Sequence, residues 1–221
     1  RVLGLDVQPD GPEGLDDYAC VDVSDDEAVG AYFERIGNDI GRLDAIVNNA
    51  AVQVTKPLIE TAPDEWDRVL DTNLRSVYLT ARHGHALLQD GGGAIVNVSS
   101  VHAVATSAHI AAYAASTGGM MALTRAMAIE FADDDIRVNA VLPGAVDTEM
   151  LRAGLNRNHV QGDDIGTRLK ELGAKHVMGR VGTPTEIGRT IHFLADSTES
   201  SFITGQALIV DGGATARLST E

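Results

Sequence analysis

Two hydroxyl-bearing side chains stand at a spacing that suits proton transfer. Ser99 and Ser100 follow the apolar run 94–98, and Tyr113 comes thirteen residues after Ser100. The run is short, β-branched and nearly continuous, which is typical of a strand buried on both faces of a parallel sheet. Apolar residues then recur at helical intervals, so Tyr113 and Thr117 lie one turn apart on a helix. A hydroxyl at a strand end that faces a phenol on the next helix can exchange a proton with a substrate.

The order of these residues resembles the short-chain dehydrogenase/reductase (SDR) family, whose signature is a serine with Tyr-x-x-x-Lys. Here Ser100 precedes Tyr113 in the setting Tyr-Ala-Ala-Ser-Thr-Gly-Gly. The resemblance implies that Tyr113 is the acid/base residue and that Ser100 hydrogen-bonds the substrate oxygen. It also implies that Asn73 holds a water of the proton relay; a buried helix asparagine satisfied by the protein itself is the alternative.

The chain departs from the family signature at Thr117, where the family has lysine. A tyrosine with a pKa of about 10 is ionised at only about one part in a thousand at pH 7. A lysine ammonium one turn away favours the phenolate, and threonine carries no charge. We therefore expect slow turnover. His102 and His109, in the loop between Ser100 and Tyr113, are conceivable substitutes, although loop histidines are usually solvated or in contact with substrate.

Polar and small residues at the other predicted strand ends match the cofactor site of the family. A carboxylate at Asp6 can accept hydrogen bonds from the ribose of NAD and repel the extra phosphate of NADP; a solvated loop aspartate is the alternative. Asp22 and Val23 resemble the pair beside the adenine, and a strand-end turn is an equal alternative. The residues that the resemblance assigns to the cofactor are Asp6, Asp22, Val23, Asn49, Ala50, Ala51, Tyr113, Pro143, Gly144, Val146 and Thr148. We expect NAD as the cofactor, with NADP less favoured.

The elements that must position these residues alternate between strand and helix patterns. Strands are expected over residues 1–6, 19–23, 43–47, 94–98 and 136–142, with a last strand within 203–213, and helices over 25–40, 63–89, 113–131 and 185–195. This order predicts an α/β fold, a doubly wound parallel sheet of the Rossmann type, as a single domain over residues 1–221. Residues 149–177 are long for a plain connection and are interpreted as a substrate lid.

The first predicted strand has the character of the second strand of a dinucleotide-binding fold. We therefore expect a preceding strand, glycine-rich turn and helix in a longer protein. Gly11 and Gly14 are a poor substitute for that turn, because they follow the wrong strand and precede no helix.

The composition limits the partners that the protein can have. The net charge is −15, with 32 acidic residues against 17 Lys and Arg, and lysines number only three. This charge disfavours nucleic acid and anionic membranes as partners, and it is typical of an acidic surface adapted to high salt. Apolar runs stay well below the roughly 20 residues that span a bilayer, so a cytoplasmic protein is expected. Cys20 is expected to be buried, His159 and His176 to lie on the surface, and the spacing of the histidines predicts no metal site.

Two functional classes remain open from the sequence. The first is an NAD-dependent oxidoreductase that acts on a secondary alcohol, a sugar or an oxo group. The second is a catalytically impaired relative that binds a dinucleotide or a sister subunit, as Thr117 suggests. In either case we expect a homodimer or homotetramer, because the helix after residue 110 carries small side chains that allow close approach, namely Ala111, Ala112, Ala115, Gly118, Gly119 and Ala122.

Overall fold

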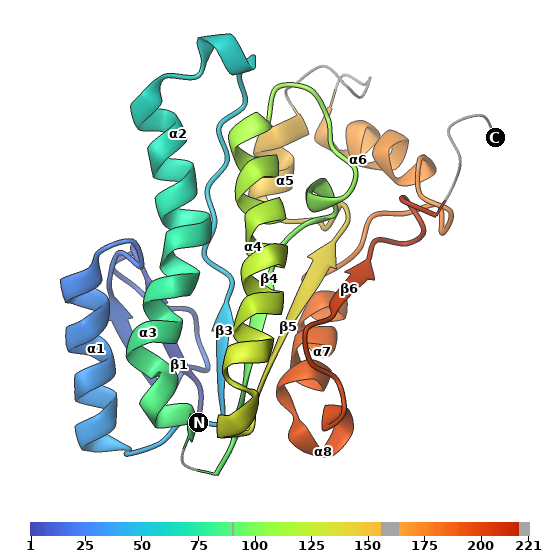
Figure 1. Cartoon of the computed structure of the whole chain (residues 1–221). Coiled ribbons are helices and arrows are strands. Elements are labelled where there is room, and N and C mark those ends of the chain that lie inside the picture. The colour runs from blue at the N-terminus through green and yellow to red at the C-terminus, as the bar shows by residue number, and fades with distance from the viewer. Residues whose placement is uncertain (90, 156–163, 217–221) are drawn as a thin grey trace.

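The computed structural model describes residues 1–89, 91–155 and 164–216. In these residues six parallel strands form two sheets (Figure 1). One sheet pairs β1 (Leu3–Asp6) with β2 (Asp17–Cys20). The other has the order β3 (Ala45–Asn48), β4 (Gly93–Val98), β5 (Ile136–Pro143) and β6 (Ala207–Val210). The parallel pairing confirms the predicted α/β class.

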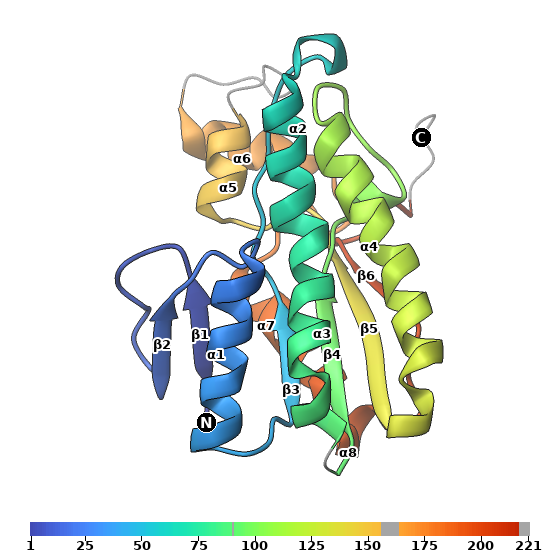
Figure 2. The same cartoon turned by 60° about the vertical axis from the view of Figure 1, so that its left-hand side comes forward.

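Helices cover both faces of the four-stranded sheet (Figures 1 and 2). One layer holds α1 (Asp26–Asp39), α3 (Ser76–Gln89) and α4 (Ala111–Glu130), and α7 (Pro184–Ala195) packs against β4 and β5 from the other side. Because of this double cover, the first seven residues of β5 are all buried. A strand buried on both faces needs a continuous apolar run and not an alternating one, which is the pattern that the sequence shows.

The long helix that the sequence predicts over 63–89 has a break in the middle. It consists of α2 (Pro63–Leu70), a π-helical turn η2 (Asp71–Arg75) and α3, which run on as one column in Figure 1. The π turn adds a residue to the helical repeat, and Asn73 within it is only 1% exposed. Such π turns occur often at functional sites, because they re-aim one side chain without ending the helix.

The start of α7 follows its sequence signal closely. Thr183 is the N-cap, Pro184 is the first helical residue, and Glu186 completes a capping box by accepting a hydrogen bond from the Thr183 backbone N–H at 2.8 Å. Proline is tolerated there because the first N–H groups of a helix have no partner within the helix. The short α8 (Ser197–Ser200) follows directly and lies next to α7.

Several short elements connect the larger ones. They are the 3₁₀ turns η1 (Leu58–Glu60), η3 (Val101–Ala103) and η4 (Ala132–Asp134), and the helices α5 (Glu149–Gly154) and α6 (Ile165–Ala174). Helices α5 and α6 belong to the predicted lid, and the part of it at 156–163 lies outside the described residues. Figure 1 shows both helices above the carboxyl ends of β5 and β6.

Two predictions about burial are wrong. Cys20 is exposed, because it ends β2, the outer strand of the two-stranded sheet, where helices cover less of the surface. His176 is only 5% exposed, since its ring packs against Gly212 and its Nδ1 atom lies 2.9 Å from the carbonyl oxygen of Leu172. His159 is outside the described residues.

Candidate active site

The predicted site residues gather at one edge of the strands. Strand β1 ends at Asp6, β3 at Asn48, β4 at Val98 and β5 at Pro143, and all of these strands are parallel to their sheet neighbours. Ligands in open parallel sheets bind outside the carboxyl ends of the strands. The candidate site is therefore built from the residues that follow these ends.

Ser100 and Tyr113 lie together at this edge. Ser100 follows β4, is 6% exposed and caps η3, with its Oγ accepting from the backbone N–H of His102 at 3.2 Å. Tyr113 is in the first turn of α4 and is partly exposed. Burial raises the pKa of the Tyr113 phenol, and a hydrogen bond with Ser100 partly opposes this rise. The pair can hold a substrate oxygen between two hydroxyl groups, but the phenol itself is strongly protonated at neutral pH.

Thr117 does not bring a polar group into the site. Its side chain is 2% exposed, and its hydroxyl donates to the carbonyl oxygens of Tyr113 and Ala114, at 3.0 and 3.2 Å. This bonding back to the preceding turn is a common way for threonine to satisfy its hydroxyl inside a helix. Thr117 therefore cannot stabilise a phenolate by charge, nor by a hydrogen bond from its side chain while that bonding persists.

Asn73 ties three segments together beneath the site. Its Oδ1 accepts from the backbone N–H of Val52 at 2.8 Å, and its Nδ2 donates to the Val52 carbonyl at 2.9 Å and to Ser116 Oγ at 3.1 Å. The amide thus joins the loop after β3 to α4 from its place in the π turn. Ser116 was missed in the sequence, because no spacing rule links residues 43 positions apart.

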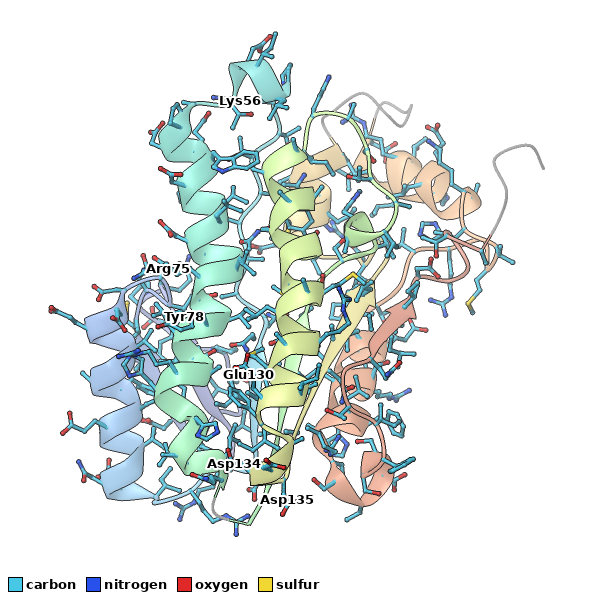
Figure 3. The ribbon with its side chains drawn as sticks, in the orientation of Figure 1. Lys56, Arg75, Tyr78, Glu130, Asp134 and Asp135 are labelled. Carbon is cyan, nitrogen blue, oxygen red and sulfur yellow. The ribbon has the colours of Figure 1, made fainter. Side chains whose placement is uncertain are left out.

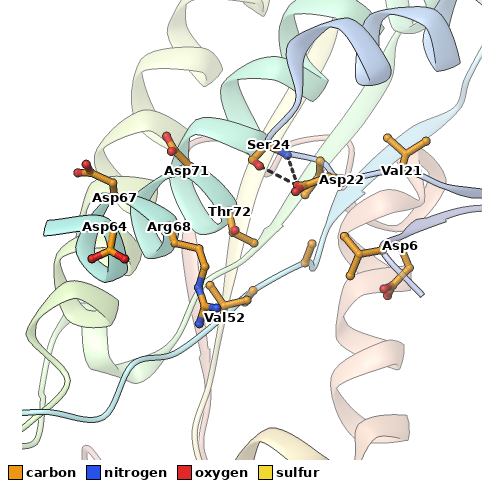
Figure 4. Close-up of a pocket in the computed structure, with 14 residues that line it drawn as sticks. Asp6, Val21, Asp22, Ser24, Val52, Asp64, Asp67, Arg68, Asp71 and Thr72 are labelled. Atoms are coloured by element: carbon orange, nitrogen blue, oxygen red, sulfur yellow. Dashed lines mark hydrogen bonds between the residues drawn. The ribbon is translucent and has the colours of Figure 1, made fainter. Parts of the chain in front are cut away.

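A cavity of about 550 Å³ opens between the ends of β1 and β2 and the helix α2 (Figure 4). That volume lies within the range of small-molecule sites, about 300–1,000 Å³. The predicted cofactor residues that line it are Asp6, Asp22, Val23, Ala50 and Ala51. The sequence did not reveal the other lining residues, Val7, Val21, Ser24, Val52, Asp64, Asp67, Arg68, Asp71 and Thr72.

The lining of this cavity fits the adenosine half of a dinucleotide. Four valines in the lining supply apolar surface that a base can contact, and the Asp6 carboxylate can accept hydrogen bonds from ribose hydroxyls. Ala50 and Ala51 are small enough for the backbone after β3 to approach a ligand closely. Asp22 is partly engaged, because its Oδ1 accepts from both the N–H and the hydroxyl of Ser24, at 2.9 and 2.7 Å.

Three other predicted cofactor residues, Gly144, Val146 and Thr148, have structural roles near the end of β5. Gly144 allows a close approach, since a Cβ there would lie 2.7 Å from the Cβ of Asp211. Val146 forms a parallel bridge with Gly182, which fixes the segment after Pro143 and β5. Thr148 caps α5 by accepting from the N–H of Leu151 at 3.3 Å.

The two asparagines at the end of β3 have different surroundings. Asn49 is exposed, whereas Asn48 joins β3 to β4 and α3, donating to Asn97 Oδ1 at 2.8 Å and accepting from the Thr80 hydroxyl at 2.7 Å. Asn97 in turn donates to Thr124 of α4 at 2.9 Å. This buried chain of polar groups holds β3 and β4 in register between the helices α3 and α4.

No helix within the described parts of the chain is long and apolar enough to cross a membrane. Over the same residues, His, Cys, Asp and Glu side chains form no group of three or more with an arrangement suited to a metal ion.

Together, the parallel fold, the nucleoside-sized cavity and the Ser–Tyr pair at the strand ends define the class of Rossmann-type dehydrogenases. The family model described as enoyl-(acyl carrier protein) reductase matches residues 8–215. The chain belongs to the short-chain dehydrogenase/reductase family, whose members bind nicotinamide cofactors, and it is an oxidoreductase that acts on CH–OH groups.

Several relatives of known structure or function resemble most of the chain. The 3-oxoacyl-[acyl-carrier-protein] reductase of Chlamydia muridarum is 38% identical over 198 residues, which are 89% of this chain and 75% of that protein. The structure of Thermoplasma acidophilum aldohexose dehydrogenase has a TM-score of 0.93 at 31% identity and covers 99% of this chain and 86% of its own. A gluconate 5-dehydrogenase from Burkholderia cenocepacia, in complex with NADP and tartrate, has a TM-score of 0.82 at 33% identity, over 91% of this chain and 76% of its own.

Proposed function

We propose that the protein is an NAD-dependent oxidoreductase that interconverts a secondary alcohol or sugar hydroxyl with the corresponding oxo group. Tyr113 is the acid/base residue, Ser100 orients the substrate oxygen, and Asn73 fixes the loop and helix that carry the site. The observation that carries this proposal is the placement of Ser100, directly after β4, beside Tyr113, in the first turn of α4, at the carboxyl edge of the sheet. The names of the relatives suggest aldohexoses, aldonates and 3-oxoacyl thioesters as the first substrates to test.

In this reaction the protein handles the proton and positions the substrate. A bound nicotinamide would supply the hydride chemistry. In the oxidation, the substrate O–H proton passes to the Tyr113 oxygen, and the Ser100 hydroxyl hydrogen-bonds the same substrate oxygen as it becomes a carbonyl. In the reduction, Tyr113 donates the proton. Because burial raises its pKa, oxidation at neutral pH is limited by how rarely the phenol is ionised.

The test of the proposal is the variant Tyr113→Phe. General acid–base catalysis contributes about 100-fold or more, so we expect kcat to fall by at least that factor while NADH still binds. Tyr78→Phe on the exposed face of α3 is the matched control, since it removes the same hydroxyl from a residue that is 48% exposed (Figure 3). Unchanged turnover in Tyr113→Phe would refute the assigned role.

For the cofactor, we propose NAD in preference to NADP. Asp6 and Asp22 are joined around the cavity by Asp64, Asp67 and Asp71, whereas Arg68 is its one cationic lining residue among those described. An additional phosphate entering this acidic surrounding is repelled. Fluorescence titration should give a tighter Kd for NADH than for NADPH, and Asp6→Asn should narrow the difference. Equal affinities for the two cofactors would contradict the preference.

A second function is favoured by one observation, the orientation of Thr117. With its hydroxyl bonded to the Tyr113 and Ala114 carbonyls, the site lacks the family lysine that lowers the phenol pKa. A chain that binds a dinucleotide or a sister subunit without useful turnover is the alternative. NADH binding without turnover on the substrate panel would establish it, and turnover on any member of the panel would exclude it.

We also propose that the protein associates as a homodimer or homotetramer through the outer face of α4. Ala115 and Ala122 are exposed, and a Cβ added at Gly118 would meet open space. Gly119, in contrast, serves internal packing, because a Cβ there would lie 2.9 Å from Leu74. Light scattering of the native protein and of Gly118→Gln tests this; a monomeric native protein would contradict the proposal.

We also propose that residues 149–177 act as a lid over the substrate.

A further inference from the structure

Between Ser100 and Tyr113 the chain carries a third titratable side chain that the proposed mechanism has not used. We infer that His102 is the proton partner of Tyr113 and takes over the task that lysine performs in other family members. This inference rests on the proposed function, since it concerns the same acid/base residue. It adds a specific residue, and it makes the protein a variant with an imidazole in place of an ammonium beside the phenol.

The position of His102 is fixed by its neighbours. It lies in the middle of η3, and its backbone N–H donates to Ser100 Oγ at 3.2 Å. Its ring meets the Tyr113 ring edge to face, with 6.0 Å between the ring centroids and 75° between the planes. The ring is half-buried, and its Nδ1 atom is buried. The backbone hydrogen bond therefore couples the position of the imidazole to the serine that orients the substrate oxygen.

The phenol needs such a neighbour. The pKa of Tyr113 is raised by burial and lowered only in part by Ser100, while Thr117 brings neither charge nor a hydroxyl into the site. A cationic group within about 4–6 Å favours the ionised form of a phenol. The edge-to-face contact places the imidazole beside the Tyr113 ring. Imidazole also titrates near neutral pH, so it can receive a proton that the phenol releases.

Among the described residues, the other charged groups on α4 and β5, the elements that pack against η3, lie away from the Tyr113 phenol. On α4, Arg125 is 12 residues beyond Tyr113, about 18 Å along the helix. On β5, Arg137 donates to the carbonyl of Leu194 and to Ser200 at the opposite end of the strand. After β5, Asp147 is paired with Arg152 at 2.8 Å.

His109 offers an internal comparison. It lies in the same loop, is exposed, and its backbone has a φ of 69°, with its carbonyl accepting from the Lys56 N–H at 2.9 Å. Asparagine tolerates this left-handed backbone better than most residues, so His109→Asn removes an imidazole with little strain. It is the matched control for His102.

The proton balance of the oxidation is as follows. Tyr113 transfers its phenol proton to the His102 imidazole and becomes a phenolate paired with an imidazolium. The substrate O–H proton then passes to the phenolate, and a bound nicotinamide would accept the hydride, with its electron pair, from the carbinol carbon. His102 finally releases its proton to water, so one alcohol yields one carbonyl group and one proton. The reduction runs through the same groups in reverse.

The first experiment uses the protein without cofactor. Tyrosine labelled with ¹³C at the ring carbon that bears the hydroxyl reports the ionisation of each phenol by NMR, and Tyr113→Phe assigns the signal of Tyr113. We expect His102→Phe, which keeps an aromatic ring, to lower the ionised fraction of Tyr113 at pH 7 by tenfold or more, because the phenolate paired with an imidazolium can no longer form. His109→Asn should leave this fraction unchanged. An unchanged ionised fraction of Tyr113 at pH 7 in a folded His102→Phe would overturn the inference.

Kinetics give an independent test. Imidazole added to His102→Ala should restore kcat with little change in KM, and substituted imidazoles should rescue in the order of their pKa values. In a double-mutant cycle, His102→Phe should lower kcat at least tenfold in the native chain but much less beside Thr117→Lys. If His102→Phe lowers kcat by the same factor in the native chain and in the Thr117→Lys variant, the inference is overturned.

The two experiments separate the two hypotheses. If the native protein shows no turnover on any substrate, the proposed function fails, while the titration of Tyr113 still decides the role of His102. If the native protein is active but the ionisation of Tyr113 is the same in the native protein and in His102→Phe, the proposed function stands and the inference about His102 fails. Should His102→Phe not fold, His102→Gln serves in both measurements.

Discussion

At the residue scale, the chemistry depends on what replaces the family lysine. Thr117 is one turn from Tyr113, as the spacing requires, yet its hydroxyl is consumed by the carbonyls of Tyr113 and Ala114. Helix geometry thus preserved the position while the residue type removed the charge. The phenol at this site has a serine and an imidazole as neighbours. Its pKa is raised, so a change that speeds the oxidation must lower this pKa.

We predict that Thr117→Lys raises turnover. An ammonium one turn from Tyr113 lowers the phenol pKa by about 1–3 units, and each unit corresponds to about tenfold in the ionised fraction. The value of kcat for oxidation at pH 7 should therefore rise by about tenfold or more. The plot of kcat against pH should move to lower pH, because the phenol ionises at lower pH. The exposed Ala31→Lys on α1 is the control, because it adds the same charge away from the site and from the proposed interface on α4. Kinetics that match the native protein would contradict the prediction.

Sequence spacing was sufficient for some site residues and not for others. Ser100 and Tyr113 could be paired from the chain, because a strand end and the first turn of the next helix must be neighbours in this fold. Ser116 and Asn48 could not, because their contacts depend on how β3, β4, α3 and α4 pack together. The role of a polar residue in a buried network is set by partners far away in the sequence.

At the element scale, the start of α7 leads to a prediction about pH. Glu186 accepts hydrogen bonds from Arg180 and from the Thr183 backbone and hydroxyl, and these interactions lower its pKa to about 2. A carboxyl group whose pKa is lowered by folding stabilises the fold above its ordinary pKa near 4.5 and loses that contribution as the pH falls toward 2.

Glu186→Gln should therefore be less stable than the native protein at pH 6, and the difference should shrink between about pH 4.5 and pH 2. Urea unfolding at a series of pH values, followed by circular dichroism, measures this. Glu130→Gln, at the exposed end of α4, is the control (Figure 3). A difference that grows on acidification would have the wrong sign for a depressed carboxyl pKa.

The boundaries of elements were harder to predict than their order. The apolar periodicity over 63–89 indicated one helix, and it did not reveal the π turn η2, because a π turn is a single-turn feature inside an otherwise α-helical run. Yet that turn aims Asn73 at Val52 and Ser116. Capping signals were more reliable: Thr183, Pro184 and Glu186 are local, and α7 starts where they predict.

At the scale of the whole molecule, the alternation of elements was enough to predict the fold class. Continuous apolar runs indicated parallel strands, and β4 and β5 form the centre of the four-stranded sheet as such runs require. Burial of single residues was less predictable. Cys20 lies in an apolar run but ends an outer strand, whereas His176 is polar but packs beside the glycine turn at 212–213.

The net charge of −15 leads to a final prediction, on salt. Like charges repel most where they share a face, as Asp64, Asp67 and Asp71 do around the cavity. Raising the ionic strength from 0.1 to 1 M shortens the screening length from about 10 to 3 Å. Each 1 kcal/mol of relieved repulsion raises Tm by about 2–4 °C in a domain of this size, and we expect a rise of at least that amount in molar KCl.

The salt effect can be assigned to these charges by comparison with a variant. Calorimetry in KCl should show a smaller rise in Tm for the triple variant Asp64→Asn, Asp67→Asn, Asp71→Asn than for the native protein. Sucrose, an uncharged solute excluded from protein surfaces, stabilises both proteins without screening and separates screening from solute exclusion. A native Tm that ignores KCl would mean that ion pairs such as Lys56–Glu65 and Arg35–Asp17, which salt weakens, offset the relief of repulsion. In that case the acidic composition would not represent adaptation to salt.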